Sequence, residues 1–294
     1  MSIIETVNLT KSYGKNRGII DVNLRIAQGE IFGFIGPNGS GKSTTIRTLL
    51  AFTYPNSGSA KIFGKNCFSD SAEIKREVGY LPAEVNYYDD MKVRDLLAYS
   101  AKFYQKDCKT RIHYLSDLFE MDLSKRIDSL SSGNKKKVAI VQALLHEPKL
   151  LILDEPTGGL DPLMQKIFFE LLKEENKRGT TIFFSSHILS EVEKLCDQVA
   201  IIKEGKILTV QSVEKLRDNK FKRFKVEFGG MESAKAFDLA FDGIKDLKIV
   251  NQQVEFLFNG KINDIISRLA QEDVINLLIE EPSLEEIFIH YYEK

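Results

Sequence analysis

The sequence predicts an α/β protein built on a parallel β-sheet, with a second, smaller α/β domain after it. Three short apolar or β-branched runs, Ile31–Ile35, 150–153 and 181–184, have the length of strands that are buried on both faces of such a sheet. Each run is followed by a turn that carries polar residues. Open α/β sheets bind ligands at the carboxyl ends of their strands, so we expect the functional site at this edge.

Apolar residues at helical spacing predict a helical subdomain within the first domain. The spacing holds over residues 93–104, and a neighbouring segment at 111–119 has the same character. Both lie between the first and second predicted strands. We therefore predict a first domain over residues 1–216, with a mostly helical insert at about residues 84–146.

The pattern changes after about residue 216, which predicts a C-terminal domain at 217–294. Residues 223–228 and 254–258 alternate between apolar and polar side chains, as half-buried strands of a small sheet do. Near the chain end, Ser283 and Glu286 form a capping-box pattern that predicts a final helix.

Composition excludes some classes of protein. The chain has 41 Lys+Arg against 42 Asp+Glu, a formal charge of −1, which argues against binding of nucleic-acid phosphates as its main task. We find no signal-peptide pattern, and no apolar run approaches the roughly 18 residues that span a bilayer. The three cysteines form no CxxC pair, so we expect reduced, buried thiols.

A phosphate-binding loop follows the first predicted strand. The segment from Gly36 to Ser43 fits G-x-x-x-x-G-K-[ST] at every fixed position and precedes a predicted helix. Backbone N–H groups of such a loop and the helix N-terminus attract an anion, while Lys42 contacts the outer phosphates and the Ser43 hydroxyl binds Mg²⁺. The predicted nucleotide-binding residues here are Gly36, Pro37, Asn38, Gly39, Ser40, Gly41, Lys42, Ser43 and Thr44.

Two acids follow the second predicted strand. Asp154 is predicted to hold Mg²⁺ through its water shell, and Glu155 to accept a proton from, or orient, the attacking water. A single acid would more often cap the next helix, but two acids downstream of a phosphate loop favour catalysis. His187 follows the third strand through two serines, and we predict a contact with the γ-phosphate.

Further motifs in the same order identify a family resemblance. Leu130-Ser131-Ser132-Gly133-Asn134 resembles the signature segment of ABC (ATP-binding-cassette) transporters, and 158–161 resembles their D-loop, with Asp161. In this resemblance Tyr13 stacks on adenine and His187 is the switch histidine. The similarity covers residues 3–210 and implies the ABC-type P-loop ATP-binding fold with a helical insert, followed by the small C-terminal α/β domain.

The segment departs from the family pattern at several positions. Ser132 stands in place of the first signature glycine and Asn134 in place of glutamine, while Ser131 and Gly133 remain to cap a γ-phosphate. Ala83 occupies the position of the usual Q-loop glutamine. For Glu84 two alternatives stay open, a contact to Mg²⁺ or water, or a cap on the following helix.

The lysine run 135–137 follows the signature, and we interpret it mainly as a solvated helix face, with a contribution to phosphate attraction as the alternative.

The resemblance implies an ATPase that uses ATP and Mg²⁺ and works with an integral-membrane subunit and a second ATP-binding subunit. Each ATP would lie between one phosphate loop and the partner's signature segment, on the cytoplasmic side of the membrane. The C-terminal segment from Glu281 resembles tails of bacterial exporters of drugs and antimicrobial peptides, which implies export. Two alternatives are a soluble, non-transport ABC-type ATPase and an ATP-binding regulatory module with little turnover.

Overall fold

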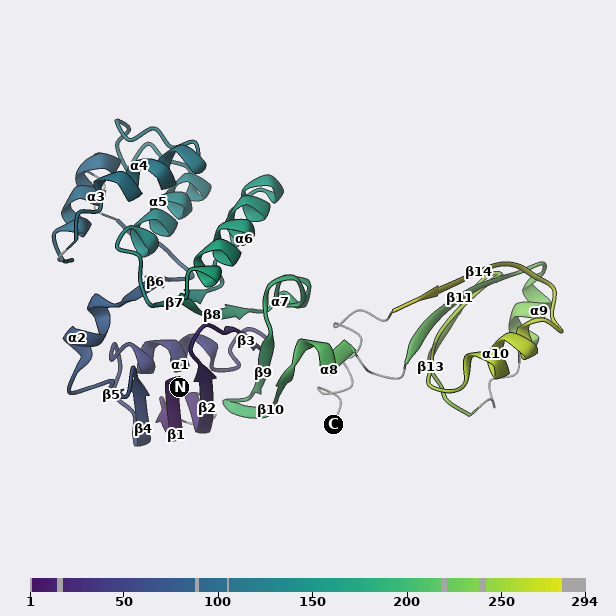
Figure 1. Cartoon of the computed structure of the whole chain (residues 1–294). Helices are drawn as coiled ribbons and strands as arrows, with labels where there is room; N and C mark the ends of the chain where they lie inside the picture. The colour runs from purple at the N-terminus through teal and green to yellow at the C-terminus, as the bar shows by residue number, and fades with distance from the viewer. Residues whose placement is uncertain are drawn as a thin grey trace. The chain divides into compact units, whose positions relative to one another are not determined.

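A computed structural model describes residues 2–14, 18–87, 90–104, 106–217, 221–237 and 242–281. The chain divides into two compact units, Met1–Ser212 and Val213–Lys294 (Figure 1). The final helix that the sequence predicts from Ser283 lies outside the described residues.

A six-stranded sheet forms the centre of the first unit and carries the three predicted strands side by side. Its order is β10-β9-β3-β8-β7-β6, with β9–β3, β3–β8, β8–β7 and β7–β6 parallel and β10 antiparallel to β9. Along the chain these strands are β3 (Ile31–Ile35), β6 (Val78–Leu81), β7 (Leu150–Asp154), β8 (Thr181–Ser186), β9 (Gln198–Lys203) and β10 (Lys206–Ser212). Every residue of β3, β7 and β8 is buried, as their apolar sequences predict. The expected α/β fold is confirmed.

A second, antiparallel sheet of four strands covers helix α1. Its order is β2-β1-β4-β5, and its strands are β1 (Ser2–Ser12), β2 (Gly18–Ala27), β4 (Ser57–Ile62) and β5 (Lys65–Asn66). Helix α1 (Lys42–Leu49) packs against β7 on one side and against β2 and β4 on the other. Its buried Ile46 and Leu49 belong to one core with Phe34 and Phe183. The helix that follows the phosphate loop is therefore fixed between two sheets.

Three longer helices form the insert between β6 and β7. They are α3 (Val93–Ala101), α4 (Lys109–Leu118) and α5 (Ser132–Leu144), and a short helix, α2 (Ser71–Arg76), precedes β6. Figure 1 shows α3, α4 and α5 gathered together beyond β6 and β7. Helix α5 contacts α3, α4 and strand β6, so it joins the insert to the edge of the sheet.

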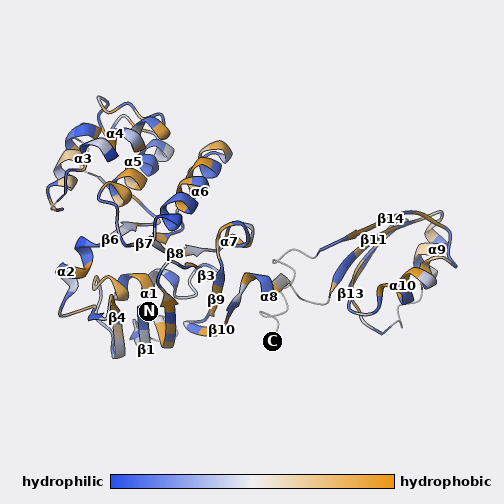
Figure 2. Cartoon of the chain, in the orientation of Figure 1, coloured by the Kyte–Doolittle hydropathy of each residue, from blue (hydrophilic) through white to orange (hydrophobic). Residues whose placement is uncertain are grey.

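Helices α6 (Pro162–Lys177) and α7 (Leu189–Leu195) lie on the side of the six-stranded sheet opposite α1 (Figure 1). Hydrophilic and hydrophobic residues alternate along α6 as the helix turns (Figure 2), and its buried residues include Phe168 and Leu172. Glu175, on the same helix, is 1% exposed. Its Oε1 lies 2.6 Å from the Arg111 guanidinium of α4, which ties the helical insert to the sheet domain.

The second unit is a four-stranded antiparallel sheet with helices on one face. Its order is β12-β13-β11-β14, and its elements are α8 (Val213–Arg217), β11 (Lys222–Phe228), α9 (Met231–Ala236), β12 (Ile244–Val250), β13 (Gln253–Phe258), α10 (Ile262–Leu269) and β14 (Val274–Glu280). Phe224 and Phe256 stack with ring centroids 5.2 Å apart in its core. The alternating patterns at 223–228 and 254–258 are thus β11 and β13.

Among the described residues, no helix combines the length and the apolar character that a membrane-spanning helix requires.

Replacement of Glu175 by Ala should lower the free energy of unfolding by about 3–5 kcal/mol, because it leaves the guanidinium of Arg111 buried without its carboxylate. Chemical denaturation measures the change. Glu174→Ala is the matched control on the exposed side of the same helix, and we expect it to lie within about 0.5 kcal/mol of wild type. Equal losses in the two variants would mean that the Arg111 pair does not stabilise the fold.

Candidate functional site

The phosphate loop lies between the end of β3 and the start of α1. Gly41, the residue before α1, has φ +113°, and a Cβ there would come 2.8 Å from the Ile19 side chain. Only glycine combines that left-handed backbone with so close a neighbour. The backbone N–H groups at the start of α1 have no partner within the helix, which makes this end an anion site.

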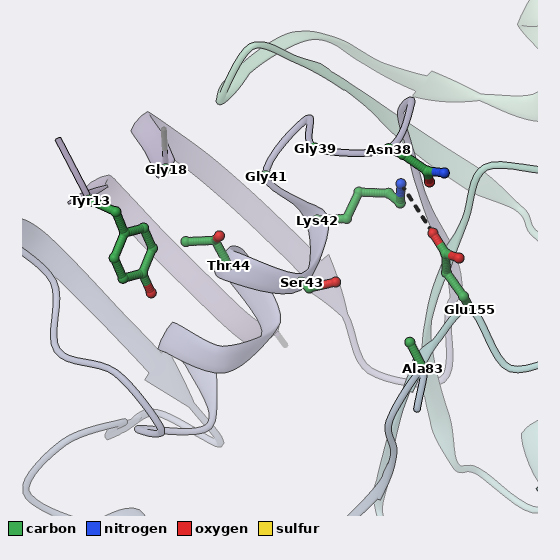
Figure 3. Close-up of a pocket in the computed structure, with 10 residues that line it drawn as sticks. All are labelled: Tyr13, Gly18, Asn38, Gly39, Gly41, Lys42, Ser43, Thr44, Ala83 and Glu155. Carbon is green, nitrogen blue, oxygen red and sulfur yellow. Dashed lines mark ion pairs between the residues drawn. The ribbon is translucent and has the colours of Figure 1, made fainter. Parts of the chain in front are cut away.

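The Lys42 side chain lies inside the loop that it completes. The residue is 4% exposed, and its Nζ donates to the carbonyl oxygens of Gly36 at 2.7 Å and Pro37 at 3.1 Å. The same Nζ lies 3.4 Å from Glu155 Oε1 (Figure 3). Ser40 Oγ is buried nearby and has no hydrogen-bond partner among the described residues. A buried ammonium and an unpaired hydroxyl fit the phosphate oxygens that the sequence predicts here.

A cavity of about 470 Å³ opens beside the loop (Figure 3). It brings together residues from the segment after β1, the start of β2, the phosphate loop, α1 and the turns after β6 and β7. Its lining is Tyr13, Gly18, Asn38, Gly39, Gly41, Lys42, Ser43, Thr44, Ala83 and Glu155. Gly36, Pro37 and Ser40 stand in the loop behind this lining, so the predicted nucleotide residues from 36 to 44 form one continuous structure.

Asp154 ends β7 beside the Ser43 hydroxyl. It is 3% exposed and accepts a hydrogen bond of 3.2 Å from Ser185 Oγ at the end of β8. Burial raises the pKa of the Asp154 carboxyl, while hydrogen bonds from Ser43 and Ser185 oppose that shift. A carboxylate and a hydroxyl side by side suit a hard cation such as Mg²⁺. No group of three His, Cys, Asp or Glu residues that could hold a metal exists in the described part of the chain.

Glu155 has an unusual backbone at the turn after β7. Its φ is +46°, a left-handed conformation that costs a non-glycine residue roughly 1–2 kcal/mol. Its N–H donates to the Ser185 carbonyl at 3.0 Å. The conformation directs its carboxylate to Lys42 on one side and to His187 Nδ1, at 3.2 Å, on the other. Lys42, Glu155 and His187, three residues predicted from separate segments, therefore form one chain of contacts.

The turn that carries His187 is fixed by hydrogen bonds around Ser186. The Ser186 hydroxyl donates to the buried carboxylate of Glu191 at 2.7 Å and accepts from the N–H of Ile188 at 2.9 Å. His187 itself is 46% exposed in its side chain and is outside the cavity lining. It reaches the site through Glu155.

Lys136 is a buried residue beside the site that the sequence analysis missed. The interpretation of 135–137 as a solvated helix face is wrong for this residue, which is 3% exposed. Its Nζ donates to the carbonyl oxygens of Pro82 at 3.0 Å, Ala83 at 3.1 Å and Glu155 at 3.3 Å. Burial lowers its pKa to about 8, against the opposing charges of Asp154 and Glu155. Helical spacing to the buried Ala139 and Ile140 was the available signal, because it places residue 136 on the inner face.

The turn after β6 presents its backbone to the site. Ala83 lines the phosphate cavity, whereas the Glu84 side chain lines a different cavity of about 530 Å³. The alternative prediction, that Glu84 caps the following helix, is wrong, because α3 begins at Val93 with Lys92 at its N-cap. A magnesium contact from Glu84 stays a prediction that its position does not favour.

The signature segment starts α5, away from the phosphate cavity. Ser131 is the N-cap, and its Oγ accepts from the Asn134 N–H at 3.3 Å. A Cβ on Gly133 would lie 2.7 Å from the Gly159 carbonyl, so glycine is required for the close approach to the D-loop. Asp161 caps α6, with Oδ1 accepting from the Met164 N–H at 3.0 Å. None of these residues lines the cavity of the same chain.

Comparisons with known proteins agree with this architecture. A family model described as "ABC transporter" matches residues 19–158. The chain is 36% identical to the bacitracin transport ATP-binding protein BcrA of Bacillus licheniformis, over 98% of this chain and 96% of the relative. It is 30% identical to the protein of the same name from Enterococcus faecalis, over 97% and 95%. A solved structure of the ATP-binding subunit of an ABC transporter matches with a TM-score of 0.70 and 31% identity, over 74% of this chain and 92% of that one.

The predicted stacking of Tyr13 on the nucleotide base can be tested by substitution, because its ring is exposed. The residue is 52% exposed, and its hydroxyl lies 3.4 Å from Thr53 Oγ1. Tyr13→Ala should weaken ATP and GTP binding alike by about 1–3 kcal/mol, because stacking depends on the ring and tolerates either base. Tyr13→Phe keeps the ring and should bind as wild type does. Calorimetric titration measures both, and an unchanged affinity in the Ala variant would exclude stacking.

Proposed function

Since the chain belongs to the ABC transporter family as an ATP-binding, ATP-hydrolysing subunit, we propose that it powers export of a drug, an antimicrobial peptide or a similar amphiphile. The relatives named for bacitracin transport align with nearly the whole chain, which supports a cargo of that class. The cargo would cross through a separate integral-membrane subunit, with this chain bound at the cytoplasmic face.

The observation that supports ATP hydrolysis as the energy source for this export is the chain of contacts from Lys42 through Glu155 to His187. Lys42 binds the outer phosphates of ATP. In the structure, its ammonium group contacts two uncharged carbonyls and one carboxylate. Phosphate oxygens are strong, charge-assisted acceptors, so they compete with these contacts. Glu155 then accepts a proton from the attacking water or orients it, and His187 contacts the γ-phosphate.

Ser43 and Asp154 are the residues that would hold Mg²⁺ at this site. Bound Mg²⁺ neutralises charge on the phosphate oxygens. The buried position of Asp154 and its hydrogen bonds from Ser43 and Ser185 keep its carboxylate directed at the end of the phosphate loop. Tyr13 stacks on the adenine at the other end of the cavity.

Two subunits would complete each ATP site. Ser131 and Gly133 start α5 outside the cavity of their own chain, so their proposed use is to cap the γ-phosphate of ATP on a second subunit. Asp161 belongs to the D-loop that Gly133 approaches at Gly159. Each charge-assisted hydrogen bond across the nucleotide contributes about 1.5–3 kcal/mol to closing the pair. Hydrolysis and phosphate release remove these bonds and reopen it.

The cavity beside the helical insert is the proposed docking surface for the membrane subunit. It measures about 530 Å³ and has aromatic side chains in its lining, among them Tyr87, Tyr99 and Phe103. Tyr99 and Phe103 are 52% and 63% exposed, and their rings meet edge to face at 5.2 Å. Pro82 lines the same cavity, one residue from Ala83 of the phosphate cavity. A partner seated there would lie next to the ATP site.

Replacement of Glu155 by Gln tests the catalytic assignment. ATP turnover should fall by about 10²–10⁴-fold, because the amide cannot accept the proton of the attacking water, while ATP binding persists. A phosphate-release assay and a nucleotide-binding titration give the two quantities. Glu174→Gln makes the same change on the exposed side of α6 and should turn over ATP as wild type does.

Near-normal turnover in Glu155→Gln would remove Glu155 from the catalytic role. A wild-type chain that binds ATP with negligible turnover would favour the regulatory-module alternative. Co-purification with a multi-spanning membrane protein would separate a transporter subunit from a soluble ABC-type ATPase.

A further inference from the structure

The ammonium group of Lys136 joins three segments that meet at the ATP site. Lys136 lies near the start of α5. Its ammonium group donates to three backbone carbonyls, all within 3.3 Å, which belong to the loops after β6 and β7. Two acceptors, Pro82 and Ala83, belong to the turn after β6. The third is the backbone carbonyl of Glu155, the residue proposed to activate water.

The Glu155 backbone requires such external support. Its left-handed conformation is unfavourable for a side chain with a Cβ, so it persists only where neighbouring contacts fix it. The contacts to its main-chain polar groups are the bond from its N–H to Ser185 and the bond to its carbonyl from Lys136. The first comes from the central sheet, and the second comes from the helical insert.

We propose that Lys136 is a positioning residue for ATP hydrolysis: it holds the left-handed backbone of Glu155 and so fixes the carboxylate between Lys42 and His187. The inference rests on the proposed role of Glu155. Without the Lys136 contact, rotation of the Glu155 backbone out of the left-handed region would move the carboxylate away from both partners. ATP binding depends on other residues of the phosphate loop and would be retained.

The same contact couples the site to the two surfaces that partners would occupy. Ser131 and Gly133 lie at the end of α5 that also carries Lys136, so a movement of that end on capping a second subunit's ATP displaces the ammonium. Pro82 lines the cavity beside the helical insert, and Ala83 lines the phosphate cavity. The Ala83 methyl group offers no polar contact to the site, but the Ala83 carbonyl is linked to the Glu155 carbonyl through Lys136. Movement at either surface thereby reaches the Glu155 backbone.

Substitution of Lys136 in the full-length chain tests the inference. Lys136→Met keeps the length of the side chain and removes its donors, and Lys136→Gln keeps N–H donors on a neutral group. We expect Lys136→Met to lower kcat by about 10–100-fold, since a small misplacement of a catalytic group has effects of this size. The KM for ATP should stay within about twofold of wild type, and Lys136→Gln should have a kcat between the two.

Lys137→Met is the matched control, because the neighbouring lysine donates instead to the Phe119 carbonyl within the helical insert. It should keep the wild-type kcat. Rates are expressed per ATP-binding site, measured by titration with a fluorescent ATP analogue, so that unfolded protein does not count as slow protein.

Two results would overturn the inference. The first is a wild-type kcat per site in Lys136→Met, with or without a loss of binding sites, which is what a purely structural role would produce. The second is an equal loss of kcat in Lys137→Met. A wild-type chain that binds MgATP without turnover would instead overturn the proposed function, and the inference with it. The inference is supported by a tenfold or greater loss of kcat at constant KM in Lys136→Met that Lys137→Met does not share.

Discussion

The left-handed backbone of Glu155 is the constraint on which the rest of the site depends. It turns the chain sharply at the end of β7, where the parallel strands β8 and β3 also end. The turn places the Glu155 carboxylate 3.4 Å from Lys42 and 3.2 Å from His187. Lys42 and His187, which are 145 positions apart in the sequence, therefore contact the same carboxylate. This backbone is stabilised from both sides, by Ser185 of the sheet and by Lys136 of the helical insert.

The fold places the phosphate loop and the signature segment in different parts of the first unit. The phosphate loop and Asp154 are fixed by the core that α1 shares with both sheets, which keeps the residues proposed to bind phosphate and Mg²⁺ in place. The signature segment and the aromatic cavity belong instead to the insert, which contacts the sheet domain through α5, the Lys136 ammonium and the Arg111–Glu175 pair.

Much of this arrangement could be predicted from the sequence, and the exceptions have physical causes. The central strands were predictable because their positions are buried and almost all apolar. The phosphate loop was predictable because its backbone conformation requires glycine at fixed positions. The antiparallel sheet was not predicted, since irregular register between β1 and β2 near Leu9 breaks the alternation of buried side chains. Lys136 was missed because a run of three lysines predicts a solvated face, although helical spacing places this residue on the inner face, and because its carbonyl partners belong to distant segments.

We propose that a second subunit completes the site around Glu155. A mixing experiment tests this completion most directly. Lys42→Ala removes the phosphate contact and Ser131→Arg blocks the signature, so each variant alone should lack ATPase activity. A 1:1 mixture should regain about a quarter of the wild-type rate, because random pairing makes half of the dimers mixed, each with one complete site of two. Full activity of Ser131→Arg alone would contradict completion of the site by a second subunit.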